Sequence, residues 1–242
     1  MSRAVGYLQG TAIVIVCWWL AAFLLDTPAL PGPYAALCAL AADAAQIGPA
    51  LAVSTWRILL SLAIGTVLGA PLGLWLGRSA GADRVLGPVL GVLYPIPKVV
   101  FLPVLFVMLG LGGEAKVALI SVAVFFQVAV SMRDAARAVP ASAVLSVRSL
   151  GGTRADVMRE VVFPATTSAL FTALRVTCGT AIAVLFIAEG MAGSSGLGYY
   201  VMHSWTLLDY DAMFAGIVAF AVLGIVVYEL FEAAERFTSR WR

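Results

Sequence analysis

Four ionisable residues lie within or beside long apolar stretches of this sequence: Arg57, Lys98, Arg175 and Glu189. A charge at the centre of a bilayer costs about 2.5–3.5 kcal/mol on insertion scales, so such residues are usually functional or paired. Arg175 and Glu189 are fourteen positions apart, about 21 Å along one helix, and therefore cannot pair with each other on that helix. The chemistry open to the four residues is attraction of a charged solute or bonding to groups of the protein itself.

Residues that make or break covalent bonds are sparse. His203 is the single histidine, and Cys17, Cys38 and Cys178 are scattered without a CxxC or Cys/His cluster. This pattern argues against a disulfide framework and a zinc site, and favours small apolar packing residues at the three cysteines. The chain also has no GxxxxGK[ST] motif, which is the phosphate-binding loop of many ATPases. We therefore expect no catalytic residue and no metal site.

The composition places the chain in a membrane. Of its 242 residues, 62% are apolar and 12% are charged, whereas a soluble domain carries about 25% charged residues. The N-terminal apolar run, 5–25, exceeds the roughly 7–15 residues of a signal-peptide core, so we interpret it as a retained span. We predict an all-α integral membrane protein whose single domain, 1–242, has six spans of about 20 residues each. The predicted spans are about 8–25, 53–77, 85–109, 116–132, 168–189 and 212–230.

The connections between these spans alternate in charge, and basic connections stay in the cytoplasm. One side carries most of the basic residues: Arg3, Arg78, Arg84, Arg133, Arg137, Arg148, Arg154, Arg159, Arg236, Arg240 and Arg242. The other side carries acids: Asp26, Asp43, Glu114, Asp209 and Asp211. Both termini are therefore expected in the cytoplasm. A helix at about 34–47 is expected to lie on the outer membrane surface.

Four prolines interrupt the third predicted span, from Pro88 to Pro103. Proline removes a backbone donor, and in a bilayer the freed carbonyl must face protein or water. We therefore expect this span to line a translocation path, the alternative being a bent helix with a purely structural role. Candidate path residues are Pro95, Pro97, Lys98 and Glu189, the last of which could instead serve a structural partner.

A cytoplasmic loop at about 133–165 is far longer than a connection between two spans requires. Gly151 and Gly152 predict a tight reversal, after which Thr153 can cap a new helix together with Asp156. That helix is expected to run from Arg154 to Val162 and to end at Pro164, with an apolar stripe formed by Val157, Met158 and Val161. Such a helix suits docking into a groove of a soluble partner, or equally resting on lipid headgroups.

The spacing of this loop resembles the EAA loop of ABC importer permeases. Gly151 and Pro164 fit the pattern, Val161 and Phe163 are apolar substitutes, and Leu145–Ser146–Val147 replace the E-A-A triplet. Five further segments look like the permeases of the nitrate, sulfonate, taurine and bicarbonate importer group: 54–57, 65–73, 94–98, 188–189 and 194–198.

The resemblance implies the six-helix fold of type I ABC importer permeases (MetI-like) in the bacterial inner membrane. It implies a path for a small, anionic or sulfonate-like solute, which Lys98 could attract. The implied partners are a second permease copy, two ATP-binding cassette subunits, an extracytoplasmic substrate-binding protein and membrane lipid, without nucleic acid. ATP and Mg would bind the ATPase partner, and no cofactor would bind this chain. The implied ATPase-docking residues are Gly151, Gly152, Thr153, Arg154, Asp156, Val157, Met158, Val161, Phe163 and Pro164.

Two other classes of protein make different predictions. An ion-driven secondary transporter or channel predicts an internal repeat with broken helices in corresponding halves, and the sequence shows no convincing repeat. An intramembrane enzyme predicts a clustered nucleophile and base or a set of metal ligands, which the sequence lacks.

Overall fold

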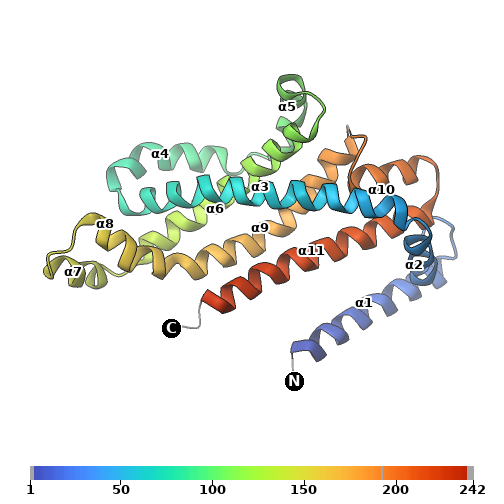
Figure 1. The fold of residues 1–242 in the computed structure, drawn as a ribbon, viewed down its shortest axis with the longest axis horizontal. Helices are drawn as coiled ribbons and strands as arrows, with labels where there is room; N and C mark the ends of the chain where they lie inside the picture. The colour runs from blue at the N-terminus through green and yellow to red at the C-terminus, as the bar shows by residue number, and fades with distance from the viewer. Residues whose placement is uncertain (1–2, 192, 239–242) are drawn as a thin grey trace. The chain divides into compact units, whose positions relative to one another are not determined.

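The computed structural model describes residues 3–191 and 193–238, so Arg240 and Arg242 of the predicted cytoplasmic end lie outside the described residues. Every regular element in those ranges is helical, which confirms the all-α prediction (Figure 1). A 3₁₀ turn, η1, precedes α5, and a π-helical turn, η2, precedes α9. The elements are α1 (Arg3–Leu25), α2 (Pro33–Ala42), α3 (Ala44–Arg78), α4 (Ala80–Leu93), η1 (Lys98–Phe101), α5 (Leu102–Leu109), α6 (Gly113–Ala138), α7 (Ala141–Ser149), α8 (Arg154–Val157), η2 (Met158–Val162), α9 (Phe163–Met191), α10 (Leu197–Thr206) and α11 (Tyr210–Thr238).

Within these ranges, five helices are long and apolar enough to cross a bilayer, and a bent pair raises the number to six. The five are Val5–Leu25, Ala44–Arg78, Gly113–Ala138, Arg154–Met191 and Tyr210–Thr238. The sixth is the predicted third span, 85–109, which is two helices rather than one: Ala80–Leu93 and Lys98–Leu109 meet at 84°. Prolines cause the break, because Pro95 and Pro97 lack N–H donors and disfavour a helical residue before them. Figure 1 shows α5 turning away from α4.

Helix ends also differ from the predicted bounds. The predicted surface helix is present as α2, but α3 begins at Ala44, well before the predicted start near residue 53. Much of the predicted loop at 133–165 is helical, since α6 extends to Ala138 and α7 follows at once. These helices are longer than hydropathy indicates because each helical residue satisfies its backbone hydrogen bonds within the helix, so the helix can continue beyond the apolar window.

Contacts divide the chain into two compact units, and α3, α9 and α11 contribute a segment to each. The first unit contains the chain up to Ser54 together with Glu189–Leu223, and the second contains Thr55–Ala188 together with the chain from Gly224 onward.

In the second unit, α3 and α6 cross at very short range. Gly65, Gly69, Gly73 and Gly77 form a small-residue seam on α3, and a Cβ added at any of them would lie 2.4–2.7 Å from an atom of α6. Small residues allow this approach of two backbones in lipid, where no hydrophobic effect drives helices together. The neighbouring α4 is fixed to α6 by Asp83, which accepts hydrogen bonds from Arg133 and Arg137.

In the first unit, a few polar and aromatic contacts hold the short helices. Trp18 of α1 donates its indole N–H to the Pro31 carbonyl at 2.9 Å and stacks on Phe214 of α11. Tyr200 of α10 donates its hydroxyl to Asp43 at 2.7 Å. Burial raises the pKa of Tyr200, and the hydrogen bond to Asp43 raises it further. The phenol therefore stays protonated and keeps its O–H donor.

Candidate functional site

The predicted reversal after α7 is present and has the geometry of a Schellman motif. Gly151 has a φ of +83°, and its N–H donates to the Arg148 carbonyl at 3.0 Å. The Gly152 N–H donates to the Val147 carbonyl, also at 3.0 Å, and a Cβ at Gly152 would lie 2.6 Å from a Val147 methyl. Gly151 needs a left-handed backbone, and Gly152 needs space for the close approach of Val147. Glycine meets each of these requirements without strain.

The predicted cap of the following helix is also present. The Thr153 hydroxyl accepts from the Asp156 N–H at 3.3 Å, and the Asp156 carboxylate accepts from the Thr153 N–H at 2.7 Å. These reciprocal bonds form a complete capping box and satisfy two donors at the start of α8. The Schellman motif and the capping box are adjacent, so α7 and α8 form a hairpin whose turn is fixed from both sides.

The predicted end of this helix at Pro164 is wrong. The helix continues through the π-helical turn η2 into α9 without interruption, and the N–H of Phe163 donates to the Met158 carbonyl. The wider turn allows the chain to pass a residue that has no N–H. Thr166 then donates its hydroxyl to the Val162 carbonyl at 2.9 Å, which satisfies an acceptor near the proline.

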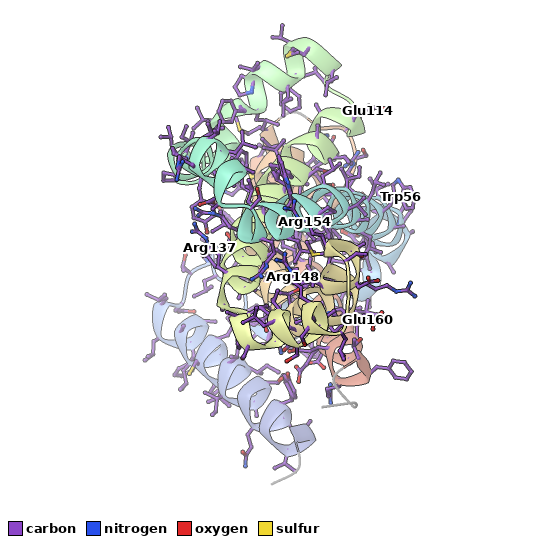
Figure 2. The ribbon with its side chains drawn as sticks, turned by 90° about the vertical axis from the view of Figure 1, so that its left-hand side faces the viewer. Trp56, Glu114, Arg137, Arg148, Arg154 and Glu160 are labelled. Atoms are coloured by element: carbon purple, nitrogen blue, oxygen red, sulfur yellow. The ribbon has the colours of Figure 1, made fainter. Side chains whose placement is uncertain are left out.

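The apolar residues of the hairpin point in two directions. Of the predicted stripe, Val157 is buried at 6% exposure and Met158 and Val161 are half-buried, so the stripe packs against the chain itself. Leu150, which sequence reasoning did not select, is 89% exposed and stands directly before the Gly151 turn. Leu145 of α7 is 63% exposed. Figure 2 looks onto this region, with Arg148, Arg154 and Glu160 labelled around the hairpin. The turn of the hairpin therefore presents an exposed aliphatic side chain, Leu150, between the exposed Arg148 and Arg154 along the chain.

Lys98 follows the break in the third span and is bonded to the backbone there. Its ammonium donates to the carbonyls of Leu93 at 2.7 Å, Tyr94 at 3.0 Å and Ile96 at 2.7 Å. It also lies 4.6 Å from the Phe126 ring centroid on α6. An ammonium has three donors, and all three are used here. Of the two interpretations left open by the sequence, the structure shows bonding to freed carbonyls.

Glu189 lies near the end of α9 and is completely buried. Its Oε2 accepts from the Ser54 hydroxyl at 2.8 Å and from the Gly198 N–H at 2.9 Å. The same Ser54 hydroxyl accepts from the Leu197 N–H at 2.8 Å. Gly196 has a φ of +101°, and a Cβ there would lie 2.3 Å from the Glu189 carboxyl group. The carboxyl group thus binds the N-terminus of α10 to α9 and α3.

The structure also places the other ionisable residues identified in the sequence. Arg175 pairs with Glu235 of α11 at 2.8 Å rather than with Glu189, and Arg57 is buried at 8% exposure. His203 is exposed on α10. Within the described residues, no group of three or more His, Cys, Asp or Glu side chains could hold a metal ion.

Comparison with known proteins gives consistent results. Residues 65–240 match the family described as the binding-protein-dependent transport system inner membrane component. The chain is 31% identical over 251 residues to the taurine transport system permease protein TauC of Escherichia coli strain K12, covering 100% of this chain and 91% of that protein. It is 29% identical to the putative aliphatic sulfonates transport permease protein SsuC of Bacillus subtilis strain 168, covering 79% and 70%. Among solved structures, an inward-facing MetNI methionine ABC transporter chain superposes with a TM-score of 0.69 at 19% identity, covering 80% of this chain and 96% of that one.

Proposed function

Because this chain belongs to the family of binding-protein-dependent transport system inner membrane components, the permeases of ABC importers, we propose that the α7–α8 hairpin docks it onto an ATPase subunit. The protein is a multi-pass permease of the bacterial inner membrane and has the type I importer fold. The observation that supports the docking role is the exposed Leu150 on a turn fixed by the Schellman motif and the capping box. A rigid projection of this kind can transmit a rigid-body movement.

The assembly we propose contains two copies of this chain, two ATP-binding cassette subunits and an extracytoplasmic binding protein. ATP and Mg bind the cassette subunits, and this chain binds no cofactor. Both termini and the hairpin lie in the cytoplasm, in agreement with the arginines of that side. Closure of the cassettes on ATP moves the docked hairpin, and the continuous helix from Arg154 to Met191 carries that movement into the membrane.

Replacing Leu150 by glutamate is expected to abolish co-purification of the ATPase subunit from detergent extracts. Burial of a leucine side chain contributes about 1.5–3 kcal/mol, and a buried unpaired charge in its place adds a further cost. The exchange should leave the permease folded because Leu150 has few contacts within the chain at 89% exposure. The yield of ATPase per permease and the rate of uptake are measured together.

The matched control is Leu111→Glu, since Leu111 is 65% exposed in the turn between α5 and α6, on the predicted outer side. It should retain the ATPase subunit. Wild-type ATPase recovery and uptake with Leu150→Glu would rule out the docking role. Equal losses in both variants would assign the effect to a surface charge in general.

We propose a small organic sulfonate as the solute, because two similar permeases are named for taurine and aliphatic sulfonates. The break around Pro95 and Pro97 is proposed to line the translocation path, while Lys98 stabilises the break. The three N–H donors of the Lys98 ammonium are already used by backbone carbonyls. Lys98→Met should therefore impair folding of the third span more than it changes solute preference.

The solute class is tested by uptake in cells that express the whole transporter. Radiolabelled taurine or an alkanesulfonate should accumulate in an ATP-dependent manner, and excess nitrate or a pyrimidine precursor should not compete. Competition by nitrate or the pyrimidine, without competition by sulfonates, would contradict the proposed class. Calorimetry on the binding protein then ranks individual sulfonates.

A further inference from the structure

An open groove of about 410 Å³ lies in the first unit. Pro28, Pro31 and Ala35 line it from the connection before α2 and from α2 itself. Residues 208–211 line it from the end of the turn after α10 and from the first turn of α11. Both segments belong to the side of the sequence that carries acids and almost no Lys or Arg, which is the predicted outer side.

The groove combines an apolar lining with two carboxylates. Leu208 contributes an aliphatic side chain that is 67% exposed, and its φ of +59° turns the chain sharply at this point. Asp209 caps α11 by accepting from the Ala212 N–H at 3.0 Å. Asp211, in the first turn of α11, is exposed. Prolines and Leu208 suit the aliphatic stem of a lysine or arginine, and the carboxylates suit its charged head.

The surroundings are typical of a protein interface. Trp205 and Leu207, which precede the turn, are 51% and 65% exposed, and Tyr34 at the start of α2 is 82% exposed. Large exposed aromatic side chains in the segments that flank a charged groove in sequence are the composition expected of an anchor region. The two carboxylates would repel a free anion or an anionic headgroup. No cluster of metal-binding side chains occurs among the residues that the structure describes.

We propose that this groove is a docking site on the permease for a basic side chain of the substrate-binding protein. The proposal rests on the proposed function, because it requires an importer that receives its solute from such a protein. It assigns the polarity of the contact: the permease contributes the acids Asp209 and Asp211, and the binding protein contributes lysine or arginine.

The test uses the permease–ATPase complex in nanodiscs, titrated with ligand-loaded binding protein. Asp211→Lys is chosen because Asp209 also caps α11. It should raise the binding-protein concentration that gives half-maximal ATPase stimulation by about tenfold or more, since charge reversal slows association. Added salt should weaken stimulation of the wild-type complex and have little effect on the variant. Basal ATPase activity and co-purification of the ATPase should be unchanged.

Glu114→Lys is the matched control, because Glu114 is an exposed acid on the predicted outer side in another segment. An unchanged titration with Asp211→Lys would overturn the groove proposal, as would equal shifts in both variants. Direct binding of the binding protein to the permease alone in nanodiscs is a second readout. This binding measurement tests the groove proposal even if the ATPase subunit fails to co-purify with the wild-type permease. Such a failure would contradict the hairpin proposal and not the groove proposal. A compensating Lys→Asp or Arg→Asp exchange in the binding protein should restore binding to Asp211→Lys.

Discussion

Replacing Gly73 by leucine is expected to leave no folded permease in the membrane. A Cβ alone at this position would lie 2.4 Å from the Ala129 carbonyl oxygen and 2.7 Å from the Met132 Cβ. The nearest atom belongs to the α6 backbone, so it cannot move aside as a flexible side chain could. Extra methylenes in a packed interior cost about 1–3 kcal/mol where the surroundings adjust, and a leucine here would force the two helices apart.

The effect is large because the crossing is continuous. A Cβ added at Gly69 would lie 2.7 Å from the Phe125 carbonyl oxygen, and one added at Gly77 would lie 2.5 Å from the Arg133 carbonyl oxygen. A displacement at Gly73 therefore separates α3 from α6 along several turns and removes their van der Waals contacts, which are the main attraction between helices in lipid. Even Gly73→Ala should lower the free energy of unfolding by about 1–3 kcal/mol.

The measurement is the yield of monodisperse protein in mild detergent, followed by the midpoint of thermal unfolding. Gly48→Ala is the control, since it lies on the same helix α3 and a Cβ there meets nothing within 4 Å. Alanine is favoured over glycine in a helix by about 0.5–1 kcal/mol, so this variant should be as stable as the wild type or more stable. Equal yields and midpoints for the Gly73 and Gly48 variants would contradict the close crossing.

Local pattern was sufficient to predict the hairpin, and it also indicates the seam. The four-residue spacing of Gly65, Gly69 and Gly73 indicates one helix face whatever the partner helix is. Gly151, Gly152 and Thr153 likewise determine a turn through backbone conformations and bonds that reach only a few residues. These features depend on short-range geometry, which a single sequence contains.

Other features depend on what the chain meets in space. Pro164 was expected to end a helix, but the π-helical turn at Met158–Val162 accommodates it, and π turns have no simple sequence signal. Helix α10 was not predicted, because the serines and glycines of Ser194–Gly198 are typical of a flexible loop. The first turn of α10 is stabilised by Glu189 and Ser54. These two residues are 135 positions apart in the sequence. No periodicity links residues at that separation.

Glu189→Ala is expected to be the most damaging single change in the first unit. It would leave the Ser54 hydroxyl and the Gly198 N–H without their acceptor in a fully buried place. Each unsatisfied buried group costs about 1–3 kcal/mol, so the loss should reach several kcal/mol and release the start of α10. The expected readouts are a lower unfolding midpoint in detergent, faster proteolysis between α9 and α10, and loss of uptake. Glu114→Gln, an exposed change, should alter none of them.

A double-mutant cycle separates the Ser54 contact from the general cost of disturbing a buried site. Ser54→Ala and Glu189→Gln each weaken the same bond, so their free-energy losses should be less than additive, with a coupling of about 0.5–3 kcal/mol. Gly196→Ala gives an independent approach to the same carboxyl group, because its Cβ would contact Glu189 and its φ of +101° is strained for alanine. Additive losses for Ser54→Ala and Glu189→Gln, together with a stable Gly196→Ala variant, would show that the carboxyl group does not hold α10. With the expected coupling, Glu189 acts by fixing α10 in place, and its effect on uptake follows from the position of that helix rather than from contact with the solute.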